Sequence, residues 1–428
     1  MKIYSSELLK DKVIYTKLSC GLKVYISDLK CVSTNYMLIG TNFGSMDIQY
    51  IDAFTGKKVI LPIGTQHFLE HKVFSDEGVT LDEITKLGLS SNAYTTKNTT
   101  VYFIEGLNNF TLGAEHLIKK VLSPVFTDEN IKSERCIIER EIDGFNARNT
   151  SRLKGSVNEQ LYASSTFKYP VLGTSESISK ITKECLYGAY NNFYSLDNMF
   201  LIYIGSVSSY EDEISKIDSL VNRYLNKEVV REKNRSVEYF VASSSVEQKE
   251  ILDVLESTDI SKLCISFKLE RAFSSNLYIK RSVALNMLQS IYFGLCTDFF
   301  TYMSECFASA VSLSYEASKA YEHVQIYMEC RDILQAKAEI LKNVRYMKKN
   351  AVSKEEFTRA KRKAVAGYIR SFSSPSTLAN IIMQAQMLDI SPYYVLEVLD
   401  TLSIEDLEKY KEILFNENMM YINIEEKN

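Results

Sequence analysis

Two histidines four residues apart carry the strongest chemical signal in this 428-residue chain, which has only four histidines in all. His67 and His71 fall in the stretch GTQHFLEH, with Glu70 directly before the second histidine. Residues i and i+4 of a helix lie on one face, so both imidazoles can bind one metal ion. Glu70 then stands beside the metal, where a carboxylate can accept a proton from a metal-activated water. The alternative is a chance pairing on an amphipathic helix, which so histidine-poor a composition makes improbable.

A third metal ligand has to come from another element, and a predicted helix further along offers two carboxylates. Ile131, Ile138 and Phe145 mark the apolar stripe of that helix, and Glu134 and Glu141 occupy its intermediate positions. Carboxylates are costly to bury unless they are paired or bound to a metal. We therefore predict Glu141 as the third ligand and Glu134 as its companion. The alternative is that both carboxylates face solvent beside a rotated stripe.

The elements that must position these groups follow one order in each half of the chain. The first half is predicted to form strands near residues 22–28, 35–44, 90–107 and 199–207, and helices near 65–74, 80–87, 110–122 and 128–145. The second half is predicted to form strands near 263–269, 310–318 and 321–330, and helices over 282–303, 333–347 and 353–369. Two segment pairs also match in pattern, 126–145 with 352–372 and 177–205 with 401–425.

This repetition predicts a duplicated α+β protein with two homologous domains. The charged stretch 225–250 is the predicted linker, which gives a first domain over 1–228 and a second over 229–428. Ala360 and Gly367 stand where the first domain has its two carboxylates, so the second domain should lack metal ligands. The alternative is that two unrelated α+β halves merely look alike.

Composition limits the classes of function. Lys and Arg total 50 against 54 Asp and Glu, and the net charge of −4 argues against a nucleic-acid binder. No stretch approaches the roughly 18 apolar residues of a membrane helix, and the N-terminus lacks the apolar region of a signal peptide. The 8 cysteines form no C-x-x-C pair, and we interpret them as reduced, mostly buried thiols of a cytoplasmic protein. His116 and His323 have no ligand-spaced neighbour and are predicted to be structural or solvated.

Four stretches resemble motifs of the pitrilysin/insulinase family of zinc peptidases. GTQHFLEHKVF is similar to the family's metal helix, and SERCIIEREI to its downstream E-R-x-x-x-x-x-E segment. LSSNAYTTKNTTVYF resembles the strand that pairs with substrate, and KYPVLGTSESI a loop that follows it. The likeness is closest to the short members, of the bacterial YmfH and AlbF type and the β subunit of mitochondrial processing peptidase. It covers nearly all of the first half and is looser in the second.

The resemblance implies a zinc endopeptidase that binds one Zn²⁺ per chain. His67, His71 and Glu141 would be the ligands, Glu70 the catalytic base and Glu134 the assisting acid. It also implies domains in which a mostly antiparallel sheet packs against helices, the two domains together forming half of a clamshell.

The resemblance further implies a peptide substrate that adds as a strand along Asn92, Ala93, Tyr94 and Thr95. The alternative for this segment is an ordinary interior strand. Substrates would be peptides or unfolded segments, among them leader or precursor peptides. A chain that supplies half a chamber is expected to pair with a second, homologous chain, as a homodimer or a heterodimer.

The second half departs from the family in one respect. Family members often have an arginine and a tyrosine seven residues apart that hold the substrate backbone, whereas residues 301–315 contain no arginine. A partner chain could supply this clamp. The alternative function is therefore a non-catalytic or partner-dependent subunit of a processing-peptidase-like complex, and the intact H-x-x-E-H motif argues against it.

Overall fold

The described residues of the computed structural model are 1–29, 34–74, 81–147, 149–225, 250–253, 260–269, 274–307, 309–318 and 320–425. They divide into two compact units, each assembled from separate segments of the chain. Unit 1 falls within residues 1–145, 169–239 and 369–393, and unit 2 within 146–168, 240–368 and 394–428. The predicted domain boundary at residue 228 lies outside the described residues.

Unit 1 is built on a seven-stranded sheet with the order β1-β2-β3-β9-β4-β8-β7. Neighbouring strands are antiparallel except for β3 and β9, which are parallel. The strands of the unit are β1 (Lys2–Ser6), β2 (Asp11–Lys17), β3 (Lys23–Asp28), β4 (Asn35–Thr41), β7 (Ser90–Thr95), β8 (Thr100–Gly106) and β9 (Met199–Gly205), with a separate pair β5 (Gln49–Ile51) and β6 (Lys58–Ile60). Its helices are α1 (Thr65–Phe74), α2 (Leu81–Lys86), α3 (Phe110–Leu122), α4 (Asp128–Asn146), α6 (Ser175–Ser179), α7 (Lys183–Phe193), α8 (Tyr210–Tyr224) and α13 (Pro375–Leu388).

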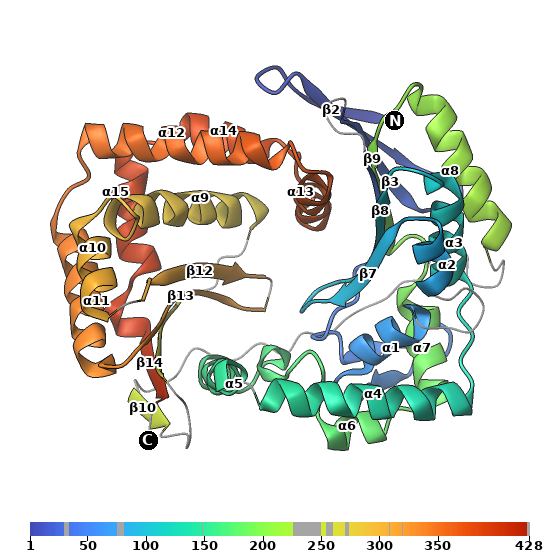
Figure 1. Cartoon of the computed structure of the whole chain (residues 1–428), viewed down its shortest axis with the longest axis horizontal. Coiled ribbons are helices and arrows are strands. Elements are labelled where there is room, and N and C mark those ends of the chain that lie inside the picture. The colour runs from blue at the N-terminus through green and yellow to red at the C-terminus, as the bar shows by residue number, and fades with distance from the viewer. Residues whose placement is uncertain are drawn as a thin grey trace. The chain divides into compact units, whose positions relative to one another are not determined.

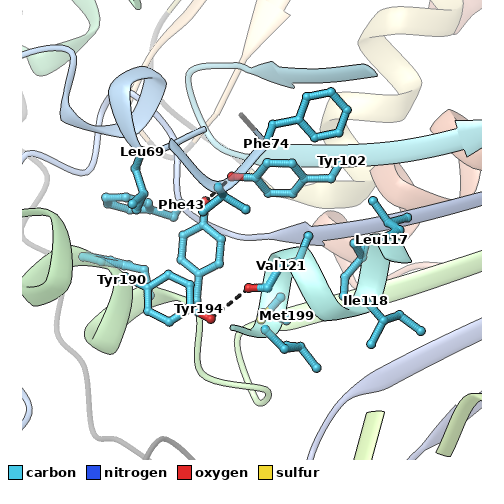
Figure 2. Close-up of a cluster of buried hydrophobic side chains, with 14 of the residues drawn as sticks. Phe43, Leu69, Phe74, Tyr102, Leu117, Ile118, Val121, Tyr190, Tyr194 and Met199 are labelled. Carbon is cyan, nitrogen blue, oxygen red and sulfur yellow. Dashed lines mark hydrogen bonds between the residues drawn. The ribbon is translucent and has the colours of Figure 1, made fainter. Parts of the chain in front are cut away.

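The main core of unit 1 lies between one face of this sheet and the helices α1, α3, α7 and α8. Alternate residues of β4, β8 and β9 meet apolar residues of these helices there, as the strand period of two requires. Figure 2 shows part of this core, including buried tyrosines that keep their hydroxyls bonded. Tyr102 and Tyr194 share a hydrogen bond of 2.7 Å, and Tyr190 donates to the Val121 carbonyl at 2.8 Å. These bonds satisfy hydroxyls that would be costly to bury alone.

The opposite face of the same sheet is covered by α13, which contacts β9 and β4. Its residues Leu378, Ala379 and Ile382 are fully buried, yet none belongs to the core on the first face. Figure 1 shows α13 across the sheet from α3 and α8. A helix from near the C-terminus therefore completes the unit that contains residues 1–145.

Unit 2 is built on a five-stranded sheet with the order β10-β14-β11-β13-β12. Its strands are β10 (Glu250–Asp253), β11 (Ser261–Lys268), β12 (Ser312–Ala317), β13 (Glu322–Cys330) and β14 (Met420–Glu425). Its helices are α5 (Asn149–Tyr162), α9 (Ser275–Tyr292), α10 (Asp298–Phe307), α11 (Ile333–Lys349), α12 (Lys354–Ser371), α14 (Tyr394–Thr401) and α15 (Ile404–Leu414), with short 3₁₀ turns at Thr166–Lys168 and Glu417–Met419.

The two sheets repeat one arrangement. The order β3-β9-β4-β8-β7 in unit 1 corresponds to β10-β14-β11-β13-β12 in unit 2, and in each sheet only the first pair of that series is parallel. In unit 1 α13 packs on β4 and β9, and in unit 2 α5 packs on their counterparts β11 and β14. The prediction of a duplicated α+β fold with mostly antiparallel sheets packed against helices is confirmed.

Two sequence predictions about the fold are wrong. The helix predicted over 282–303 is two helices, α9 and α10, separated around Gly294. A Cβ at Gly294 would lie 2.8 Å from the Ser290 carbonyl oxygen, so the chain turns there where only glycine fits. The described cysteines are free but not mostly buried, because Cys136, Cys296 and Cys306 are exposed and only Cys264 and Cys330 are buried.

None of the described helices combines the length and the apolar character needed to cross a membrane.

Candidate metal centre

The start of α1 is fixed by a close contact between two glycines. Gly64 and Gly173 both have positive φ, 89° and 77°. A Cβ on Gly173 would lie 2.5 Å from the Ile63 carbonyl oxygen, and one on Gly64 would lie 2.9 Å from the Gly173 Cα. Ser177 Oγ donates to the same Ile63 carbonyl at 2.7 Å. The sequence GT before the histidines and the loop motif KYPVLGTSESI therefore meet in space, and together they set where α1 begins.

Three predicted ligands converge at one point. Nε2 of His67 lies 3.7 Å from Oε2 of Glu141, and Nε2 of His71 lies 3.5 Å from the same oxygen. All three ligand atoms lie within 4.8 Å of one another. Among the described residues this is the only group of three or more such side chains close enough to hold a metal ion. Two imidazole nitrogens and one carboxylate oxygen are a donor set that zinc accepts, with one position left for water or substrate.

Helix α4 supplies the carboxylates and begins at a well-formed cap. The Thr127 hydroxyl accepts from the Asn130 amide at 3.2 Å, and Asn130 Oδ1 accepts from the Thr127 amide at 3.0 Å. Glu134 is buried on α4, whereas the Glu141 side chain is 46% exposed. The alternative that both carboxylates face solvent is therefore wrong for Glu134. The half-exposed Glu141 gives the centre an open side.

Glu134 connects α4 to the second histidine. Its Oε1 lies 3.0 Å from Nδ1 of His71. An ionised carboxylate can only accept, so Nδ1 carries a proton, and in the neutral imidazole Nε2 keeps its lone pair toward Glu141. The ammonium of Lys72, also buried, lies 3.8 Å from the other oxygen of Glu134. The Lys72 contact was not predicted, and its only sequence signal is a lysine directly after the H-x-x-E-H motif.

The two histidines differ in their affinity for protons. Burial and the neighbouring His71 lower the pKa of His67 to about 3. Burial also acts to lower the pKa of His71, but its hydrogen bond with Glu134 and the charges of nearby carboxylates outweigh this, so the pKa is raised. A metal ion therefore finds His67 already neutral near pH 7 and competes with a proton for His71.

Glu70 lies on the same helix, buried beside the ligands with 6% of its surface exposed. Burial raises the pKa of its carboxyl, and a hydrogen bond from the Thr95 hydroxyl at 2.6 Å acts in the opposite direction. A carboxylate with a raised pKa accepts and returns protons near neutral pH more readily than an ordinary one.

The strand predicted to bind substrate is an edge strand. β7 contains Asn92, Ala93, Tyr94 and Thr95, and among the strands that the structure describes it is the last of the unit 1 sheet and pairs with β8 alone. The alternative of an interior strand is therefore wrong. Its last residue, Thr95, reaches Glu70. Tyr94 points to the opposite face of the sheet, where its hydroxyl donates to Asn380 Oδ1 on α13 at 3.2 Å. Nothing in the sequence indicated this contact with α13.

The corresponding place in unit 2 holds a charge pair in place of ligands. Helix α9 contacts β12 as α1 contacts β7. From α9, the buried Arg281 pairs with the buried Glu322 at the start of β13, and Tyr315 of β12 donates to the same carboxylate at 2.8 Å. His116 is half-buried on α3, and His323 is fully buried against Tyr162, in agreement with the structural or solvated roles predicted for both.

Comparison with known proteins assigns the family. The profile of "Insulinase (Peptidase family M16)" matches residues 62–175, and that of "Peptidase M16 inactive domain" matches residues 180–364. This chain belongs to the insulinase family, peptidase family M16. The family predicted from the sequence motifs is confirmed.

Relatives in the M16 family match over different lengths of the chain. The uncharacterized zinc protease YmfH of Bacillus subtilis is 27% identical over 413 residues, covering 94% of each protein. The β subunit of the mitochondrial-processing peptidase of Neurospora crassa is 31% identical over 172 residues, which cover 37% of this chain and 34% of that protein.

Solved M16 structures share the fold. An M16-like peptidase from Alicyclobacillus acidocaldarius superposes with a TM-score of 0.84 at 23% identity, covering 98% of this chain and 99% of that one. An M16 inactive domain from Pseudomonas fluorescens superposes with a TM-score of 0.76 at 15% identity, covering 97% and 98%.

Proposed function

We propose that this M16 chain is a zinc-dependent endopeptidase that cleaves peptides or unfolded segments. The observation that carries the proposal is the convergence of His67, His71 and Glu141 within 4.8 Å, with Glu70 buried on the same helix. Relatives named zinc proteases support both the metal and the reaction.

We assign one zinc ion per chain to His67, His71 and Glu141. Bound zinc would lower the pKa of a water molecule and polarise the scissile carbonyl. Glu134 orients His71, because its carboxylate accepts a hydrogen bond from Nδ1–H of the imidazole and leaves Nε2 for the metal. The open side at Glu141 would admit water and substrate.

Glu70 is the proposed catalytic residue. Its carboxylate accepts a proton from the attacking water and returns it to the leaving amine of the peptide. The pKa of this carboxyl is raised by burial, which suits both halves of that transfer. A glutamine at position 70 keeps the shape of the side chain but cannot accept the proton.

The substrate would be an extended peptide added to the side of β7 that pairs with no described strand, along Asn92, Ala93, Tyr94 and Thr95. Backbone pairing at a sheet edge accepts many sequences, which suits leader or precursor peptides and unfolded segments. The position of β7 at the sheet edge and the bond from Thr95 to Glu70 support this assignment.

We further propose that the chain acts in the cytoplasm as a homodimer or as a heterodimer with a homologous chain. The absence of an arginine from residues 301–315 supports a need for a second chain, which could complete the hold on the substrate backbone.

The decisive experiment replaces Glu70 with glutamine. Glu70→Gln should retain about one zinc per chain, as elemental analysis would measure, because the ligands are unchanged. It should lose cleavage of unstructured peptides by about 100-fold or more, the loss typical of a missing proton acceptor.

A wild-type protein without bound zinc, or one that is inactive on unfolded peptides with its partner chain present, would contradict the proposed endopeptidase activity. Zinc binding with activity only after a homologous chain is added would support the partner-dependent subunit.

A further inference from the structure

Thr95 makes the one hydrogen bond found on the Glu70 carboxylate among the described residues. Its hydroxyl donates to Oε2 at 2.6 Å, a short distance that is typical of a bond to a charged oxygen. Strand β7 alternates its side chains, so Thr95 points toward α1 while Tyr94 points to the other face of the sheet. Pairing with a substrate strand uses the backbone of Thr95 and does not explain why its side chain contacts Glu70.

The position of Thr95 is fixed from several sides. Its backbone pairs with Thr100 of β8, and the two hydroxyls lie 3.4 Å apart. The Thr100 hydroxyl itself donates to the Phe43 carbonyl at 2.8 Å. The neighbouring Tyr94 is held by Asn380 at 3.2 Å and by the Met383 sulfur at 3.9 Å, both on α13. A hydroxyl anchored this firmly can hold a carboxylate in one orientation.

We propose that Thr95 is a positioning residue for Glu70. Its hydroxyl holds Oε2, so the carboxylate presents Oε1 for the proton transfer in a fixed orientation. Thr95 is also the last residue of the edge strand. A peptide that pairs with β7 would therefore lie along the residue that orients the base. This inference rests on the proposed peptidase function and adds a residue whose side chain acts through Glu70.

The test compares Thr95→Val with Thr95→Ser in cleavage of a quenched-fluorescence unstructured peptide. Valine keeps the shape and removes the donor, so kcat should fall about 10-fold or more while KM stays within about 2-fold. Serine keeps the donor and should restore most of kcat. Zinc content should equal that of the wild type in both variants.

Thr41→Val is the matched control. Thr41 is fully buried on β4, and its hydroxyl donates to the Phe193 carbonyl at 2.6 Å. Like Thr95→Val, this control removes a hydroxyl that donates a bond of 2.6 Å, so it should lower the thermal midpoint without lowering kcat.

Three outcomes of the cleavage assay would overturn the inference. They are a Thr95→Val variant with wild-type kcat, an equal loss of kcat in Thr41→Val, and a serine variant as slow as the valine variant.

Peptide affinity separates positioning from binding. Glu70→Gln and Glu70→Gln/Thr95→Val should bind the peptide equally. A large loss of peptide affinity in the double variant would make Thr95 a binding residue instead. A wild type that cleaves no peptide would instead overturn the proposed function, on which the inference depends.

Discussion

His67 and His323 are both buried, but their imidazoles have different roles. His67 is buried with its Nε2 directed at Glu141, where it can hold a metal ion. His323 is buried with its Nδ1 3.0 Å from the Tyr162 hydroxyl, which in turn accepts the Glu322 amide at 3.0 Å. The Tyr162 hydroxyl accepts that amide and keeps its own proton available to His323, whose imidazole can accept it only while Nδ1 is unprotonated. His323 therefore has a structural role in unit 2.

His323 should make the protein less stable in acid. Burial and the nearby charge of Lys268 lower the pKa of His323 to about 3. Below the unfolded value of 6.5 the unfolded chain takes up a proton that the folded chain refuses, so this stability is complete above pH 6.5 and falls as the pH drops toward 3. At pH 5 the loss should be about 2 kcal/mol.

Urea unfolding at pH 7.5 and pH 5 measures this effect. His323→Gln should reduce the difference between the two pH values by about 2 kcal/mol. Tyr162→Phe keeps the buried imidazole and should keep the wild-type difference. An unchanged pH dependence in His323→Gln would contradict the assignment.

Among the elements, α1 depends on a loop that lies about 100 residues later in the chain. Gly64 and Gly173 approach so closely that neither position has room for a Cβ. The loop at Gly173 continues into α6, whose Thr174 hydroxyl accepts the Ser177 amide at 3.1 Å. The Ser177 hydroxyl in turn donates to the carbonyl of Ile63, just before the start of α1. The orientation of the histidine helix is thus set by packing as well as by its own sequence.

Alanine at position 173 should loosen the start of α1. Gly173→Ala introduces a Cβ 2.5 Å from the Ile63 carbonyl oxygen and forces a left-handed alanine. Gly88→Ala is the matched control, because Gly88 has nearly the same φ, 78° against 77°, and open space around its Cβ position. The control should lose about 1 kcal/mol of unfolding free energy, and Gly173→Ala about 1–3 kcal/mol more.

Urea unfolding with zinc present checks this difference, and a zinc titration should show weaker binding for Gly173→Ala alone. Equal losses in both variants would mean that the glycine contact does not support α1.

In the molecule as a whole, units and sequence repeats do not coincide. The first repeat contributes α5 to unit 2, and the second contributes α13 to unit 1. We propose that the chain consists of two sequence repeats, over 1–228 and 229–428. Each packed core then includes one helix from the other repeat. Neither repeat then has a complete core without the other.

The fragment 1–228 should therefore not fold normally by itself. Without α13, the face of β4 and β9 that buries Leu378, Ala379 and Ile382 would be open to water. The fragment should bind a hydrophobic dye and aggregate, since an apolar sheet face of this kind is an association surface. Co-production with 229–428, or addition of a peptide of residues 369–393, should suppress both effects. A fragment that is monomeric, unfolds cooperatively and binds no dye would contradict this view of unit 1.

The sequence by itself determined the family, the α+β class with its repeat, and His67, Glu70 and His71 as one chemical group. Helical periodicity is local, so residues within one turn of a helix can be placed together without tertiary structure. The α4 stripe also predicted a special role for Glu134 and Glu141, because carboxylates in apolar positions require partners.

Only the tertiary structure decided which of those two carboxylates is buried against His71 and which faces the open side. It also decided that β7 is the last of the described strands in its sheet, that Lys72 lies against Glu134, and that Asn380 lies against Tyr94. These contacts join residues far apart in the chain, and their partners depend on how strands and helices pack, which no local pattern of residues encodes.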